Sequence, residues 1–370
     1  MSCEYTVDMA NSMFPNFNEQ TKRALFYLNL RITAIASFVN SCNVVIAVVA
    51  TLIVTFHSLV LSQKSMRKTV INMCLLAVAV NYLLYMTALL ETRIIQMEGP
   101  FPECHPPLSL TAKHLQNIVY ATSNYSRRFS TWLGILMSST RLIILKSAND
   151  SKFHKLTEPR NGAILILCTF FLALPLTILS ILRYDIKEYE PWVPPETCSE
   201  YPKNYSEPNY GLVMSELFTM NNAIVHRIYY FLDGTFSKIV PGILFPMLTM
   251  ILIRELRLAQ KIRNRIGPTG RTDKTTKLVT YMTLSHMSSD LPVGITTILQ
   301  SLVVTAPGLL LIVANINSIF MTIFMLNSII QCFICYSLSQ NYRETVRELI
   351  TKTKKSLYPQ SGEHLSNTNP

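Results

Sequence analysis

Long stretches of this chain carry no ionised side chain. Four stretches free of Asp, Glu, Lys and Arg cover residues 32–63, 69–90, 161–182 and 291–342. They are long and mostly apolar rather than alternating, and a helix needs about 20 apolar residues to cross a bilayer. The fourth stretch contains the turn signal Ala306-Pro307-Gly308, so it predicts the end of one helix and the whole of the next. The pattern therefore predicts membrane-spanning helices rather than the strands of a membrane barrel.

Three further apolar spans contain charged residues in their interior. They cover residues 114–145, 224–253 and 277–304, and the last of them overlaps the fourth stretch. All the spans together predict seven helices within residues 32–339. We therefore expect an all-α fold, a polytopic membrane protein with a seven-transmembrane helix bundle.

The positions of the charges predict how this bundle is oriented. Only 15% of the 370 residues are charged, against about 25% in soluble proteins, and the net charge is +11. Most basic residues fall in the connections after the first, third and fifth helices and in the tail, and basic connections face the cytoplasm. The pattern predicts a multi-pass plasma-membrane protein with residues 1–31 outside and the C-terminus inside. The basic excess then reflects topology and the lipid bilayer, and argues against nucleic acid as a partner.

The C-terminal segment has a pattern of its own. From Asn341 to Lys355, apolar residues recur at helical spacing and basic residues fill the other face. This arrangement is typical of an amphipathic helix that lies on the inner leaflet. Within residues 340–370 we therefore expect a short amphipathic helix followed by a disordered tail that begins at Tyr358.

Several motifs recur in a fixed order along the predicted helices. They are His57 to Arg67 in the first turn, Arg127 to Arg141 in the third helix, Asp233 to Pro246 and Glu255-Leu256-Arg257 in the fifth, Asp273 to Gly294 in the sixth, and Asn327 to Cys332 followed by Tyr342-Arg343 after the seventh. As a set they resemble the nematode serpentine chemoreceptors of the Srw family. That family is similar to FMRFamide-type neuropeptide receptors among rhodopsin-like G-protein-coupled receptors. The resemblance covers roughly residues 54–349.

The resemblance implies a receptor that binds an extracellular ligand and activates a heterotrimeric G protein. It also implies a disulfide between Cys104 and Cys198, which would join the third helix to the second outer loop. The chain departs from the rhodopsin-like pattern in the second helix, where residues 76–82 contain no acid, and at Thr140, where an Asp usually precedes the helix 3 arginine. The residues to which the resemblance assigns coupling or activation are Arg141, Asn327, Pro292 and Pro241.

Charges within the predicted helices cost about 2.5–3.5 kcal/mol each at mid-helix, so they persist where they are paired or line a polar cavity. At 1.5 Å per residue, Arg127 lies about 21 Å and Asp290 about 20 Å from the cytoplasmic ends of their helices. Equal depth permits an ion pair between these two residues, and Asp233 lies near the level of Arg128. Two interpretations stay open, a structural salt-bridge network and the polar floor of a ligand pocket. The candidate residues are Arg127, Arg128, Asp233, Lys238 and Asp290.

The sequence also restricts the ligand. Residues 314–339 contain no lysine for a retinal Schiff base, and Ser123 stands where the resemblance places the carboxylate of amine receptors. The predicted second outer loop, residues 184–223, holds seven acidic and two basic residues together with many aromatic ones. Such a loop would attract a cationic peptide, although a loop that is acidic for solubility alone is the other interpretation. The same loop contains a glycosylation sequon at Asn204.

A neuropeptide is therefore the leading ligand class, and an environmental small molecule sensed by a chemoreceptor is the alternative. A membrane transporter is a remote third possibility, since the chain has neither internal repeats nor an even number of helices. The sequence shows no paired catalytic carboxylates, no Ser–His pair and no metal-ligand spacing. We therefore expect no enzymatic activity, no cofactor and no metal ion.

Overall fold

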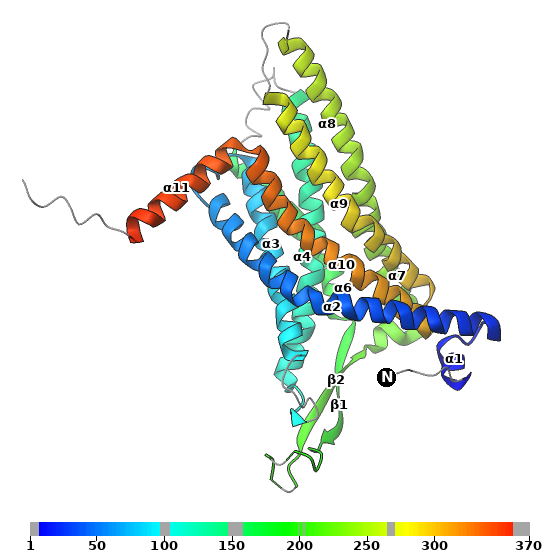
Figure 1. Ribbon diagram of the computed structural model, residues 1–370. Coiled ribbons are helices and arrows are strands. Elements are labelled where there is room, and N and C mark those ends of the chain that lie inside the picture. Colours follow the sequence, from blue (N-terminus) through cyan, green and yellow to red (C-terminus); the bar gives the residue numbers. More distant parts are fainter. Residues whose placement is uncertain are drawn as a thin grey trace, which may run out of the picture.

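The computed structural model describes residues 7–96, 104–146, 158–198, 200–202, 204–264 and 271–357 (Figure 1). The predicted tail at residues 358–370 lies outside these ranges, as does most of the connection around residues 147–157. Within them, helices dominate, which confirms the all-α prediction. A single two-stranded sheet is the exception within the described ranges.

Seven helical passes form the bundle within the described residues. They are α2 (Glu19–Leu61), α3 (Val70–Gln96), α4 (Leu110–Lys146), α6 (Pro159–Ile181), the continuous run of α7 (Glu216–Gly234), η3 (Thr235–Ile239) and α8 (Val240–Asn264), then α9 (Arg271–Leu302) and α10 (Pro307–Leu338). Two further helices, α1 (Val7–Met13) and α11 (Gln340–Leu357), lie outside the bundle. Five of the passes are long and apolar enough to cross a membrane by hydropathy alone. The two that fall short of that test, α4 and α9, carry Arg127, Arg128 and Asp290 in their interiors.

The helix order in space brings distant parts of the chain together. Helix α10 packs against both α2 and α9, α4 packs against α3, α6 and α8, and α9 packs against α7 and α8. In Figure 1 the strands project from one end of the bundle, here called the hairpin end, and α11 leaves the opposite end, here called the α11 end. Helix α1 lies at the hairpin end, where the buried ring of Phe14 packs against Gly308 at the start of α10.

The first helix of the bundle begins earlier than the charge-free stretch predicts. It starts at Glu19, where the Asn18 side chain caps it by accepting a hydrogen bond of 2.8 Å from the Thr21 amide. Lys22, one turn into the helix, pairs with Glu19 at 2.9 Å. Charges near a helix terminus end an apolar run without ending the helix, so the predicted boundary at residue 32 was too late.

The main hydrophobic core lies where α2, α3, α4 and α10 meet, and it extends to α11. The α11 helix is held there by Tyr342, which is 1% exposed and whose hydroxyl lies 2.8 Å from Nδ1 of His57 on α2. The helix matches the amphipathic segment that the sequence predicts. Its attachment to α2 and α10 through a buried tyrosine could not be read from the alternation of basic and apolar positions.

Residues 184–223, which the sequence predicts to be a loop, contain a β-hairpin that the sequence pattern did not indicate. Strand β1 (Tyr184–Trp192) pairs antiparallel with β2 (Glu207–Met214), in a register that sets Tyr184 opposite Met214. Residues 220–223 then break the helical path of α7, with Asn221, Asn222 and Ala223 in the left-handed region. Regular helix resumes at Ile224, the residue at which the predicted fifth span begins.

Two glycines allow α7 and α9 to approach closely in the middle of the bundle. A Cβ on Gly234 would lie 2.6 Å from Cγ1 of Ile298, 3.0 Å from its backbone nitrogen and 3.1 Å from the carbonyl oxygen of Gly294. Small residues at a helix crossing permit such backbone contact inside a membrane. Because two of these neighbours are backbone atoms, they cannot rotate away as a flexible side chain could.

We expect Gly234→Ala to destabilise the protein, because the added methyl group must separate α7 from α9. Overpacking of this kind costs about 1–3 kcal/mol. The matched control is Gly242→Ala on α8, whose Cβ would meet the side chain of Leu291, a group that can change rotamer. Thermal unfolding of the purified protein should show a lower midpoint for Gly234→Ala than for Gly242→Ala, and equal midpoints would contradict this account of the crossing.

Candidate functional site: a buried charge network and an adjoining cavity

A π-helical turn shapes the middle of the fifth span. In η3, the Val240 amide donates to the carbonyl of Thr235, five residues earlier, instead of four. The turn directly precedes Pro241, which has no N–H with which to continue the ordinary ladder. Turns with this wider spacing are rare and cluster at functional sites. The turn therefore follows from the local sequence. It changes which side chains of the fifth pass lie on the same face of the helix.

The wider turn brings Lys238 next to Asp233. In a regular α-helix, residues five apart point about 140° away from each other, since each residue turns the chain by about 100°. The π turn needs more residues per turn, so the fifth residue returns to nearly the same face. The Lys238 Nζ lies 2.6 Å from Oδ2 of Asp233, and both side chains are buried.

The second oxygen of the same carboxylate is bound by Arg128. The Nε of Arg128 lies 2.7 Å from Oδ1 of Asp233, and the arginine side chain is 3% exposed. Its other nitrogens donate to Thr177 on α6 at 3.0 Å and to the hydroxyl of Tyr229 on α7 at 3.1 Å. Lys238 in turn donates to Thr297 on α9 at 3.1 Å. We call these six residues the charge network: Arg128, Thr177, Tyr229, Asp233, Lys238 and Thr297.

The charge network joins four passes of the bundle around one carboxylate. Charges inside a bilayer persist when they are paired and fully hydrogen-bonded, and Asp233 meets that condition with two cations. Of the two interpretations that the sequence left open, this geometry favours the structural one for Arg128, Asp233 and Lys238.

Arg127, the neighbour of Arg128, faces a different environment. Consecutive residues on a helix point about 100° apart, so the two guanidinium groups cannot enter the same site. The Arg127 guanidinium contacts Sδ of Met321 on α10, and it lines a cavity of about 250 Å³. The other residues that line this cavity are Asn40, Asn43, Tyr85, Ala88, Leu89, Val119, Tyr120, Ser123, Asn124, Ser318, Met321 and Met325.

The ion pair that equal depth permits between Arg127 and Asp290 is not among the salt bridges of the described residues. Asp290 accepts hydrogen bonds from Thr131 on α4 at 3.0 Å and from its neighbour Ser289 at 3.3 Å. The four salt bridges between described residues do not include these two side chains together. Depth along each helix could be counted from the sequence, but the rotation of each side chain about its helix axis could not.

The residues to which the resemblance assigned activation lie toward the α11 end or at bends in the helices. Asn327 of α10 is 2% exposed, and its Oδ1 accepts a hydrogen bond from the hydroxyl of Ser285 on α9. Arg141 lies in the last turns of α4, within electrostatic range of the thiols of Cys74 and Cys335. Pro292 lies inside α9, and Pro241 follows the π turn. Their roles in coupling stay predictions.

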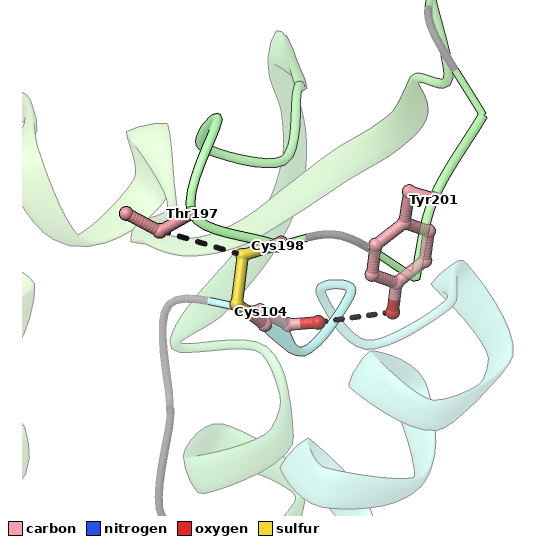
Figure 2. Close-up of a disulfide and its surroundings, with 4 residues drawn as sticks. All are labelled: Cys104, Thr197, Cys198 and Tyr201. Carbon is pink, nitrogen blue, oxygen red and sulfur yellow. Dashed lines mark hydrogen bonds between the residues drawn. A yellow bond between two sulfur atoms is a disulfide. The ribbon is translucent and has the colours of Figure 1, made fainter.

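The predicted disulfide is present and holds the hairpin end together. Cys104 and Cys198 are bonded, with their Cα atoms 5.5 Å apart, so the segment before α4 is tied to the connection between β1 and β2 (Figure 2). Figure 2 also shows Tyr201 beside this bond, its hydroxyl donating to the Cys104 carbonyl at 2.9 Å. The ring of Tyr201 contacts those of Trp192 and Tyr205. The aromatic residues noted in the sequence thus pack around the disulfide.

A second aromatic cluster, missed by the sequence analysis, connects the hairpin to the bundle. The Arg183 guanidinium lies 4.7 Å from the ring centre of Tyr184 and 4.9 Å from that of Tyr230, in cation–π geometry. Tyr120 of α4 contacts Tyr184 and also lines the cavity. The available signal was the run Leu182-Arg183-Tyr184 at the helix end, but sequence alone does not indicate which rings surround such an arginine.

The predicted glycosylation residue, Asn204, is exposed in the hairpin connection. Close to it, the hydroxyl of Tyr205 donates a hydrogen bond to the carboxylate of Glu207, which raises the pKa of Tyr205 above its usual value. Among the described residues, no group of three or more His, Cys, Asp or Glu side chains could hold a metal ion.

Seven passes, a disulfide that ties the segment before the third pass to the following hairpin, and a polar cavity among the helices are the features of seven-helix membrane receptors. Residues 41–353 match the family of serpentine 7TM GPCR chemoreceptors called Srw, and the chain belongs to this family. That family consists of receptors and not of enzymes. The resemblance stated from the sequence motifs is confirmed, as are the fold class and the location in a membrane.

One curated relative is the "G-protein coupled receptor dmsr-1" of Caenorhabditis elegans. The two chains are 25% identical over 244 residues, which cover 65% of this chain and 44% of that receptor. The present chain therefore matches less than half the length of this relative.

A double-mutant cycle can distinguish the ion pair of Arg128 from the unpaired interaction of Arg127 by their coupling energies. We expect Arg128→Gln and Asp233→Asn to destabilise the protein by about 3–5 kcal/mol each, because each leaves a buried charge without its partner. The double variant should lose less than the sum of the single losses. In thermal unfolding, the matched cycle of Arg127→Gln with Asp290→Asn should show near-additive effects, since that pair does not form. Additivity in the first cycle, or strong coupling in the second, would contradict the geometry described above.

Proposed function

We propose that this protein binds an extracellular ligand at the hairpin end of the bundle and activates a heterotrimeric G protein at the α11 end. In this orientation the N-terminus lies outside the cell and the C-terminus inside. The observation that carries the proposal is the disulfide-tied hairpin above a polar cavity, because oxidising conditions outside the cell maintain disulfides. The basic residues that follow α2 and those in the last turns of α8 lie at the other end, in agreement with the positive-inside rule.

A peptide is the leading ligand class. The hairpin region carries Asp185, Glu188 and Glu190 on β1 and further acidic residues up to Glu216, against two lysines in residues 184–223. Exposed acidic side chains at the entrance attract a cationic peptide through their field, and the rings of Tyr189 and Trp192 offer surfaces on which its side chains can stack.

One observation favours a small environmental molecule instead. The cavity measures about 250 Å³, which is less than the 300–1,000 Å³ typical of sites for drug-sized ligands. A small molecule could fill it completely, whereas a peptide could insert only one terminal residue. In both cases the ligand would enter from the hairpin end and contact α2, α3, α4 and α10.

The contacts between helices suggest how ligand binding at the hairpin end would change the arrangement of the helices at the α11 end. The ligand would favour one of two arrangements of α9 and α10, which meet through the hydrogen bond from Ser285 to Asn327. At the α11 end, α4 and α8 are joined by the pair Lys146–Glu255 at 3.7 Å, and its lysine is 54% exposed. Exposed pairs contribute little, so this contact would give way easily and uncover Arg141 for the G protein.

Glycosylation of Asn204 tests the orientation. We expect the protein expressed in animal cells to lose apparent mass on treatment with an N-glycosidase, because the proposed orientation puts the exposed sequon at Asn204 outside the cell. Asn204→Gln should abolish this change. Asn149→Gln, which alters a sequon in the connection after α4, is the matched control and should leave the change intact. A mass change that persists in Asn204→Gln and disappears in Asn149→Gln would place the hairpin in the cytoplasm.

A second-messenger assay tests receptor activity. Cells that express the protein should respond to at least one member of a panel of amidated peptides and volatile small molecules. Arg141→Ala should remove the response at unchanged surface expression, because it deletes the cation proposed to meet the G protein. A response to a peptide would support the leading class, and a response to a small molecule alone would support the alternative. Surface-expressed protein that binds a ligand without any G-protein response would contradict the proposed coupling.

A further inference from the structure

We propose that the cavity between α2, α3, α4 and α10 binds a carboxylate group, with Arg127 as its anchor. This inference rests on the proposed receptor function and adds to it the chemistry of the group that enters deepest. It also separates Arg127 from the adjacent Arg128, whose hydrogen-bonding capacity is used within the charge network.

Arg127 is a buried cation whose charge is not matched by a neighbouring acid. It is 9% exposed, and within the part of the chain that the structure describes no carboxylate lies within ion-pair distance of it. Its guanidinium meets the thioether of Met321, and a thioether is a weak acceptor for a group with five N–H donors. A buried arginine ordinarily requires a carboxylate or phosphate, so a ligand that supplies one would complete this site.

The other cavity residues offer neutral acceptors and no carboxylate to a cationic ligand. The Oδ1 of Asn40 accepts hydrogen bonds from Ser318 at 2.9 Å and from Asn43 at 3.3 Å. The Oδ1 of Asn43 accepts from Thr322 at 2.8 Å. No aspartate or glutamate is among the residues that line the cavity. An ammonium group would therefore meet the positive charge of Arg127 with little compensation, whereas an anion would meet a strong donor.

The charge balance of the surrounding helices points the same way. Three buried cations, Arg127, Arg128 and Lys238, lie in this part of the bundle with two buried carboxylates, Asp233 and Asp290. These five side chains together carry a net charge of +1, and Arg127 is the cation among them that forms none of the salt bridges between described residues and faces the cavity. In a low-dielectric site, opposite charges attract more strongly than in water, so the excess favours an anion.

The shape of the cavity limits what accompanies the carboxylate. A volume of about 250 Å³ corresponds to roughly eight waters at about 30 Å³ each. The wall opposite α4 is built from Met321 and Met325, and methionine side chains adapt to apolar groups of varied shape. The rings of Tyr85 and Tyr120 add aromatic surface beside the polar side chains of the lining. A short arylalkyl acid, free or at the end of a larger ligand, fits this description.

The test compares two probes of nearly equal shape, 3-phenylpropanoate and 3-phenylpropanamide, on the purified full-length receptor without G protein. Binding is measured by the shift in thermal unfolding midpoint as each probe is titrated. We expect the carboxylate to bind at least about tenfold more tightly than the amide, which corresponds to about 1.4 kcal/mol. Arg127→Gln should remove this preference, and Arg127→Lys should keep a reduced one, because lysine retains the charge without the planar fork.

The control variant is Arg227→Gln, which removes a positive charge from an exposed position on α7 outside the cavity and should leave the preference intact. Equal binding of the two probes, no binding of either, or a carboxylate preference that survives in folded Arg127→Gln would each overturn the proposal. If Arg127→Gln does not fold, the reduced preference of Arg127→Lys decides in its place. Because no G protein takes part, these outcomes are independent of the signalling assay, so either proposal can fail while the other stands.

Discussion

One carboxylate shared by two cations is the constraint on which the middle of this bundle depends. Asp233 pairs with Arg128 of α4 and with Lys238 of the π turn, and these cations donate hydrogen bonds to Thr177 on α6 and to Thr297 on α9. In a bilayer none of these charges could be left without a partner at an acceptable cost. The positions of four passes are therefore linked to the ionisation of one side chain.

The close packing of α7 against α9 serves the same arrangement. Gly234 follows Asp233 directly, and its lack of a side chain lets the backbones approach near Gly294. That approach brings Thr297 within reach of Lys238 at 3.1 Å. Backbone contact and charge pairing thus support each other. Arg127, one residue before Arg128, stands outside this mutual support and faces the cavity, which is why we regard it as the residue most available to a ligand.

Much of this architecture could be predicted from the sequence, because apolar length and basic connections respond to the membrane itself. The charged interiors of α4 and α9, the disulfide and the amphipathic α11 were also predicted. The sequence permitted an ion pair between Arg127 and Asp290 that is not among the salt bridges of the described residues, since counting residues gives depth but not the direction of a side chain about its helix. The hairpin was missed because its alternation is confined to a few residues near Tyr184, and acidic composition hid it. The cation–π site of Arg183 depends on rings far away in the chain, which no local pattern indicates.

The π turn has a consequence for how this chain should be aligned with its relatives. The π turn holds one more residue than an α-helical turn. Each residue between η3 and the hairpin end therefore occupies the helical position that its neighbour would occupy in an uninterrupted α-helix. A relative that lacks one residue in this segment could keep both flanking motifs and yet present a different side chain where Asp233 lies. Alignments that score identity column by column would not detect the change. Comparisons of pocket residues across the family should therefore number the fifth pass separately on each side of this turn.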